Sequence, residues 1–126
     1  MRVDRRFMIA QSYKNLTAWN KGIELVKEIY SIADHMPKSE QYILVSQMLR
    51  AAISIPSNIA EGYRRGHRLE YIHFLSISIA SAAELETQLI IAKARYPNIN
   101  YGKAEKLVDE IQRLLFVTIN KLKIKR

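Results

Sequence analysis

The amino-acid sequence predicts an all-α protein, an up-down-up-down four-helix bundle with a proline-kinked second helix. Apolar residues recur at helical spacing in four long segments, which is the pattern of amphipathic helices. Only four glycines and three prolines occur among the 126 residues, so few turns interrupt these segments. The links between the segments are short, and short links make consecutive helices antiparallel neighbours.

The first helix is predicted from Thr17 to Met36. Thr17 is a residue type that favours the N-cap position. Apolar residues follow it at helical spacing, beginning with Trp19 and Ile23. Pro37 ends the helix, because the residue before a proline is pushed out of the α region.

The second helix is predicted to begin at a Ser39 cap, with Glu40 in the first turn where the helix dipole favours an anion. Gly66 is the expected C-cap, since glycine takes positive φ freely, and Gly62 is an earlier alternative. A polar stripe runs along this helix through Gln47, Arg50, Ser54, Asn58, Glu61 and Arg65.

Pro56 lies inside the second helix and cannot donate a hydrogen bond to the carbonyl of Ala52. We therefore expect a kink there, or a break after which Ser57 and Asn58 recap the helix. Two consequences are open: a bend that wraps the helix around the bundle, or a polar notch that receives a partner. The bend is favoured, because kinks in long helices commonly originate at proline.

The third helix is predicted over about Arg68 to Arg95, and its segment "FLSISIASAA" carries no charge. Its small residues allow a neighbouring helix to approach closely. The fourth helix is predicted over about Tyr101 to Lys123, with Asn100 as its cap. Two of the four helices are apolar over more than one stripe, whereas a four-helix bundle needs only one apolar face per helix. The additional apolar surface forms either a wide core or a subunit interface. We favour the interface.

The domain organisation is predicted as a basic N-terminal arm over residues 1–14 and a four-helix bundle over residues 15–126. Without cysteine, disulfides and thiolate metal sites are excluded. No apolar run approaches the length of about 20 residues that a membrane span needs. The expected protein is cytoplasmic, without a membrane partner.

Catalytic and metal-binding chemistry lacks a candidate. Glu70 and His73 form one Glu-x-x-His half-motif, whereas carboxylate-bridged di-iron bundles need a second one. Glu84 and Glu86 are separated by about 200° around a helix, so they make no dyad. No activated nucleophile or phosphate loop occurs. We expect a non-enzymatic protein without metal or cofactor.

Positive charge is the remaining signal, with a formal net charge of +8. In an up-down-up-down bundle the second turn and both chain ends meet at one pole. Arg2, Arg5 and Arg6 belong to this pole. The expected nucleic-acid contacts there are Arg64, Arg65, Arg68, Lys121, Lys123, Lys125 and Arg126. Tyr63 and Tyr71 could stack on bases, although aromatic residues at helical spacing more often belong to the core.

The run "SQMLRAAISIPSNIAEGYRR" and the downstream "EYIHFLSISIASAAELETQL" closely resemble the bacterial four-helix-bundle proteins encoded in 23S ribosomal RNA intervening sequences. The resemblance extends over roughly Tyr13 to Lys123. It implies a kinked second helix, a ring-like homo-oligomer that is commonly a pentamer, and no established enzymatic activity. Distant relatives, the accessory variability proteins of diversity-generating retroelements, bind nucleic acid and a reverse transcriptase.

The family motif is carried by residues that the resemblance implies at a subunit junction: Arg50, Ser54, Pro56, Asn58, Glu61, Glu84 and Gln88. Ala80 stands where the family usually has glycine, and Gly22 where it usually has alanine. Two functions remain open. One is a module that binds structured RNA or DNA, as an accessory to a nucleic-acid enzyme. The other is a structural or protein-interaction scaffold without a specific nucleic-acid role.

Overall fold

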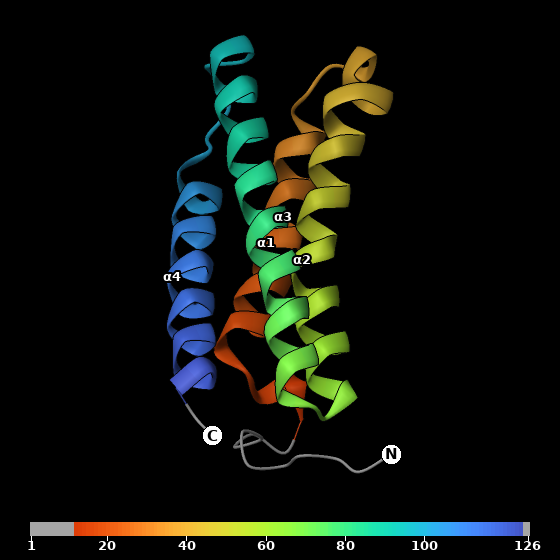
Figure 1. Cartoon of the computed structure of the whole chain (residues 1–126). Coiled ribbons are helices and arrows are strands. Elements are labelled where there is room, and N and C mark those ends of the chain that lie inside the picture. Colours follow the sequence, from red (N-terminus) through yellow and green to blue (C-terminus); the bar gives the residue numbers. More distant parts are fainter. Residues whose placement is uncertain (1–11, 125–126) are drawn as a thin grey trace.

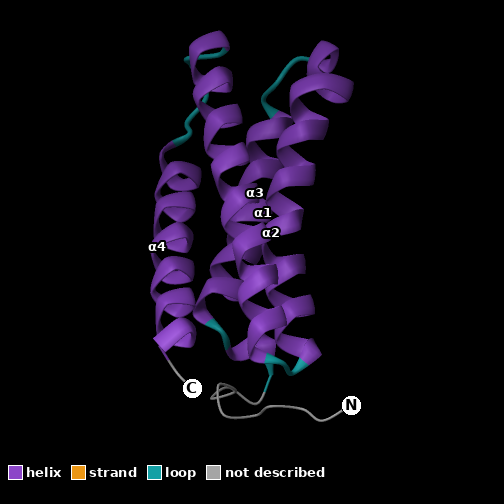
Figure 2. Cartoon of the chain, viewed as in Figure 1, coloured by secondary structure: helices purple, strands orange, loops and turns teal. Residues whose placement is uncertain are grey.

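The computed structural model describes residues 12–124 and confirms the four-helix bundle. Its four long helices are α1 (Thr17–Asp34), α2 (Ser46–Arg65), α3 (Arg68–Arg95) and α4 (Gly102–Ile124). They run up and down in turn, and no strand occurs within residues 12–124 (Figures 1 and 2). Each helix packs against its two neighbours, with α4 closing the bundle against α1.

The core is formed by apolar side chains from all four helices. Leu25 on α1, Ile55 on α2, Leu85 on α3 and Ile111 on α4 are completely buried. Burying one such side chain stabilises the fold by about 1.5 to 3 kcal/mol. The apolar spacing that predicted the helices therefore also predicted the residues that hold the bundle together.

α1 begins at Thr17 as predicted, but the predicted Thr17 cap and the predicted end at Met36 are both wrong. Leu16 occupies the N-cap position of α1 without a side-chain cap, and Thr17 is already helical. The helix ends at Asp34, two residues before the predicted Met36. The amides of His35 and Met36 bond to carbonyls three residues back, which tightens the chain before Pro37.

The start of the second helix differs most from the prediction. A 3-10 turn, η2 (Lys38–Glu40), leads into a π-helical turn, η3 (Gln41–Val45), and only then does α2 begin. Ser39 lies inside η2, with Pro37 in the cap position, so the predicted Ser39 cap is wrong. The helical spacing of the sequence does not distinguish these tighter and wider turns from an α-helix.

Pro56 lies inside α2, which continues past it as one α-helix to Arg65. The predicted break with a new cap at Ser57 and Asn58 is therefore wrong, and a bend of the axis stays a prediction. The end of α2 is as predicted, because Gly66 is left-handed with φ 72°. At the start of α4, the Oδ1 of Asn100 accepts a hydrogen bond of 3.0 Å from the amide of Gly102.

Two helical segments, Lys38–Arg65 and Arg68–Arg95, are long and apolar enough to cross a membrane by length and composition. Core helices of soluble bundles pass the same test, so this is weak evidence for a span. Both segments contribute completely buried side chains to the core of the bundle. The absence of a membrane partner stays a prediction.

Candidate nucleic-acid interface

The turn between α2 and α3 lies at the same end of the bundle as the end of α4 and the beginning of the described chain (Figure 1). We call this end the lower pole, and define it by the described residues Tyr13, Lys14, Arg64 to Arg68, and Lys121 to Ile124. Lys125 and Arg126 were also predicted to act there, as were the cations of residues 1–11. They lie outside the described residues.

Arg64 extends from the last turn of α2 and is exposed. Its guanidinium carbon lies 5.9 Å from the centroid of the Tyr13 ring. Tyr13 in turn packs edge-on against Trp19, at a centroid distance of 5.4 Å. Among residues 12–124, Arg64 makes no ion pair. The positive charge of Arg64 is therefore not neutralised by any carboxylate of residues 12–124.

Arg65 is placed differently from Arg64. Its guanidinium lies 2.9 Å from a carboxylate oxygen of Glu61 and 3.5 Å from one of Glu70. The hydrogen bond that Arg65 donates to the carboxylate of Glu61 raises the pKa of Arg65 above its ordinary value. Its guanidinium carbon also lies 5.1 Å from the centroid of the Phe74 ring. Two carboxylates neutralise Arg65, which makes it a poorer phosphate ligand than the sequence suggested.

Arg68 has an intramolecular role. Its Nη1 donates a hydrogen bond of 2.8 Å to the carbonyl oxygen of Leu122, in the last turn of α4. Carbonyls in the last turn of a helix have no partner within the helix, so this contact caps α4. It also ties the start of α3 to the end of α4. Lys121 and Lys123, in the same turn of α4, are exposed.

Tyr63 and Tyr71 belong to the core. They are 3% and 4% exposed, and their rings meet edge-on at 5.6 Å. Burial raises the pKa of both phenols. The tyrosine ring that lies beside an exposed cation at the lower pole is instead that of Tyr13, next to Arg64. Tyr13 belongs to residues 1–14, which the sequence predicted to be an arm. Nothing in the sequence indicated that its ring packs beside Arg64.

The polar stripe of α2 is partly an internal contact between helices. The hydroxyls of Ser54 and Ser81 lie 2.9 Å apart, and the Nδ2 of Asn58 donates to the backbone carbonyl and the hydroxyl of Ser54. The buried Ser78 donates a hydrogen bond of 2.9 Å to the carbonyl of Ile55. These small polar side chains join α2 to α3.

The charged members of the family motif lie at the surface. Arg50 on α2 and Glu84 on α3 are both exposed and form an ion pair of 3.8 Å across the two helices. Glu61 is also exposed and bonds Arg65. Gln88 is 9% exposed, and its Oε1 is buried without a hydrogen-bond partner within the described chain. A subunit junction at these residues stays a prediction.

Two glycines allow close helix contacts that sequence spacing did not reveal. A Cβ at Gly22 would lie 3.1 Å from the Cβ of Pro56, and a Cβ at Gly62 would lie 2.5 Å from the Cβ of Phe74. Gly22 thus leaves room for the buried proline of α2.

No group of three or more His, Cys, Asp or Glu side chains that could hold a metal ion occurs within residues 12–124.

Comparison with solved structures and sequence families places the bundle among known proteins. The chain is similar to a crystal structure of a protein with unknown function from the S23 ribosomal protein family of Bacteroides thetaiotaomicron. The TM-score is 0.73 at 24% sequence identity, over 82% of this chain and 98% of that one, which shows a shared fold. No curated protein matches the chain in sequence. The model of the 23S rRNA-intervening sequence protein family matches residues 14–117, most of the chain, so the protein belongs to this family.

Proposed function

We propose that the protein is a non-enzymatic nucleic-acid-binding module, which holds the phosphate backbone of structured RNA or DNA at its lower pole. The observation that carries this proposal is the gathering of Lys14, Arg64, Lys121 and Lys123 at one end of the bundle. All four are exposed, and none of them forms an ion pair within residues 12–124. Unneutralised cations gathered in this way bind polyanions.

Binding to phosphates is expected to be largely independent of base sequence. The lower pole consists of helix ends and lysine side chains and contains no element that reads base edges. Contacts to phosphates fix where a protein lies on a nucleic acid, but they do not distinguish one base from another. Arg64 is suited to such a contact because its planar guanidinium bonds two phosphate oxygens at once. Arg65 and Arg68 support the pole through Glu61 and Leu122. The proposal places the protein in the cytoplasm. It also allows the module to act as an accessory to a nucleic-acid enzyme, whose identity it does not specify.

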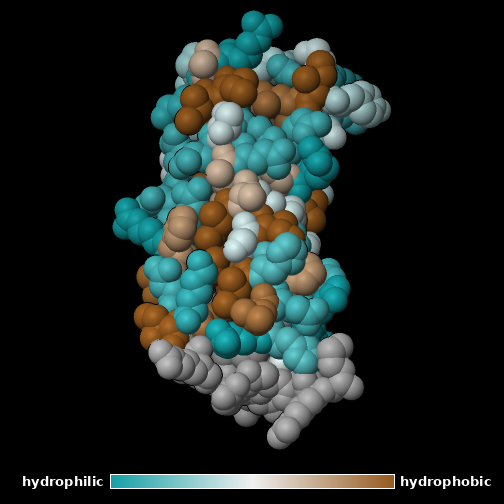
Figure 3. All heavy atoms as spheres, in the orientation of Figure 1, coloured by the Kyte–Doolittle hydropathy of each residue, from teal (hydrophilic) through white to brown (hydrophobic). Residues whose placement is uncertain are grey.

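We also propose a homo-oligomer, with five subunits favoured by the family resemblance. The supporting observation is apolar surface left exposed by the single chain, which Figure 3 shows as brown areas along one face. Exposed apolar side chains on α2, α3 and η3 include Ile53 at 42%, Ile91 at 52% and Ile43 at 65%. A ring would repeat the lower pole in every subunit, and weak phosphate contacts would then add through avidity.

The test is a salt series of fluorescence anisotropy with a structured RNA and a duplex DNA. The triple variant Arg64→Ala, Lys121→Ala, Lys123→Ala is compared with Lys38→Ala, Lys103→Ala, Lys106→Ala, which removes equal charge elsewhere. The first variant should weaken binding to every sequence, and should lower the salt slope by about two to three units.

The control should retain both the affinity and the salt slope. An equal loss of nucleic-acid affinity in both variants would mean that binding depends on the net charge of the protein and not on the lower pole. Absence of binding by the unaltered protein at low salt would favour the alternative, a protein-interaction scaffold.

A further inference from the structure

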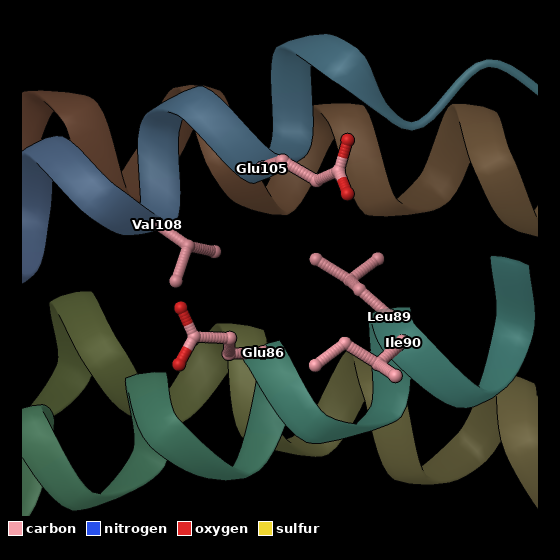
Figure 4. Close-up of a pocket in the computed structure, with 5 residues that line it drawn as sticks. All are labelled: Glu86, Leu89, Ile90, Glu105 and Val108. Atoms are coloured by element: carbon pink, nitrogen blue, oxygen red, sulfur yellow. The ribbon is translucent and has the colours of Figure 1, made fainter.

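A groove runs along the seam between α3 and α4. It has a volume of about 190 Å³ and is lined by Glu86, Leu89, Ile90, Glu105 and Val108. Figure 4 shows the carboxylates of Glu86 and Glu105 on opposite sides of the groove, one from each helix. Leu89 and Val108 are buried and form an apolar floor, and Ile90 is 64% exposed. The groove is smaller than the roughly 300 Å³ at which pockets for drug-sized ligands begin, so its size suits a small ligand.

The side chains that line the groove accept hydrogen bonds but donate none. Leu89, Ile90 and Val108 carry no polar side-chain atom, and an ionised carboxylate only accepts. Within residues 12–124, Glu86 takes part in no ion pair or side-chain hydrogen bond. A ligand that matches this lining therefore has an apolar middle part and a cationic hydrogen-bond donor at each end.

The second carboxylate, that of Glu105, already has one neighbour. The Nζ of Lys93 lies 3.3 Å from one of its oxygens and 3.5 Å from the other, and both side chains are largely exposed. Exposed pairs of this kind contribute little to stability. A carboxylate also has about four lone-pair sites, so Glu105 can accept from a second donor beside Lys93. A cation in the groove can therefore share Glu105 with Lys93 or replace it.

The spacing of the two carboxylates limits the length of the ligand. Glu86 precedes Lys93 by seven residues of α3, which corresponds to a rise of about 10 Å. Because the carboxylate of Glu105 lies beside Lys93, the two carboxylates are about 10 Å apart along the seam. Two ammonium groups on a four-carbon chain are about 6 Å apart, and a charged hydrogen bond of about 2.8 Å at each end extends this reach to about 12 Å. An aliphatic diamine of this length can thus bond both carboxylates at once.

Two other kinds of ligand fit the lining less well. A divalent metal ion needs several oxygen ligands around one point. In the described part of the chain no group of three or more His, Cys, Asp or Glu side chains could hold one, and apolar surface separates the two glutamates. A peptide would bring backbone carbonyls, which need donors that the lining side chains lack. A diammonium ion needs acceptors only.

We propose that the groove between α3 and α4 binds a free aliphatic polyamine, with one ammonium group at Glu86, another at Glu105, and the methylene chain on the apolar floor. The methylene groups leave water as they cover Leu89 and Val108, which favours binding. This site is independent of the proposed nucleic-acid binding, because it uses none of the cations at the lower pole.

An NMR titration of the full-length protein with putrescine, the four-carbon diamine, tests the proposal. The protein is first freed of nucleic acid, because polyamines also bind phosphates. The methyl signals of Leu89, Ile90 and Val108 report on the groove and should shift together, with a dissociation constant on the order of 1 mM. Butylamine has the same chain with one ammonium group. It should bind about fivefold more weakly, because it lacks one of the two charged contacts.

Substitutions at the two ends of the ligand test the assigned contacts. Glu86→Gln and Glu105→Gln should each weaken putrescine binding about fivefold, whereas Glu24→Gln removes an exposed carboxylate from α1 and should leave it unchanged. Lys93→Met removes the cation that competes for Glu105 and should strengthen binding about threefold. Its matched control, Lys27→Met, removes an exposed lysine from α1 and should leave the affinity unchanged. Circular dichroism checks that each variant is folded.

The proposal is overturned if the methyl signals of the groove stay unshifted at a tenfold excess over the expected dissociation constant, or if putrescine and butylamine bind equally. Equal effects of the groove variants and their α1 controls would also overturn it, because binding would then follow net charge alone. A capped tripeptide of lysine, leucine and lysine that binds more tightly than putrescine would identify a docking site for a protein segment, and a free polyamine would then be the wrong ligand.

Discussion

At the residue scale, Gly62 sets the distance between α2 and α3. An added Cβ would lie 2.5 Å from the Cβ of Phe74 and 3.3 Å from the ring carbon Cδ1 of Tyr71. Gly62→Ala should therefore destabilise the protein by about 1 to 3 kcal/mol, as overpacking does, despite the higher helix propensity of alanine. Urea unfolding measures the change.

The matched control for this substitution is Gly102→Ala. A Cβ at Gly102, in the exposed first turn of α4, would meet only the Oδ1 of Asn100 at 3.3 Å. We expect a change within about 0.5 kcal/mol there, as for most surface substitutions. A stability increase for Gly62→Ala would show that α2 and α3 can separate at little cost.

Arg64 and Arg68 lie on either side of the turn between α2 and α3 and have different roles. Arg68→Ala removes a charged hydrogen bond to the carbonyl of Leu122 and should destabilise the protein by about 1 to 3 kcal/mol. Arg64→Ala should leave unfolding unchanged within about 0.5 kcal/mol while weakening nucleic-acid binding. Thermal or urea unfolding beside anisotropy separates the two effects, and the reverse pattern would contradict both assignments.

At the element scale, the contact between α2 and α3 depends on small polar side chains in the seam between the helices. Ser81 is 8% exposed, with its hydroxyl 2.9 Å from that of Ser54. Ser81→Leu should force the helices apart and cost about 1 to 3 kcal/mol. Ala94→Leu adds the same kind of side chain at an exposed position of the same helix and should be tolerated. Near-UV circular dichroism and urea unfolding distinguish the two variants.

At the scale of the whole molecule, four tyrosines make the stability of the bundle decrease as the pH becomes alkaline. Burial raises the pKa of Tyr63, Tyr71 and Tyr101, and a hydrogen bond of 2.6 Å to Glu40 raises that of Tyr96. Their ordinary pKa is 10.0, so the folded protein retains protons that the unfolded chain loses above that value. The resulting stability is complete below pH 10.0 and is lost as the pH rises through the folded-state values.

We therefore expect the free energy of unfolding to fall between about pH 10 and about pH 12, with the largest contribution from Tyr71, whose pKa burial raises most. Urea unfolding across this range, followed together with tyrosinate absorbance, measures it. Tyr71→Phe should flatten the dependence because it removes one titrating group. A free energy that is level over this range would contradict the predicted linkage.

The sequence by itself determined the number and the type of the helices. Apolar periodicity requires one buried face on each segment, and this requirement is local enough to read along the chain. It also determined the Gly66 ending of α2 and the Asn100 cap of α4, because positive φ and capping oxygens depend on one or two residues. The family motif in α2 and α3 was long enough to identify the family that the matched residues confirm.

Only the tertiary structure decided which cations of the lower pole are unneutralised. Glu61 and Glu70 neutralise Arg65, and Arg68 caps a helix 54 residues further along the chain, whereas Arg64 is exposed without an ion pair among residues 12–124. The same holds for the π-helical turn and for the room that Gly22 leaves for Pro56. The contacts of Arg68 and of Gly22 join segments far apart in sequence, so the packing of all four helices together sets them. The partners of Arg65 and the π-helical turn are local, but they depend on side-chain and backbone conformations that apolar spacing does not specify.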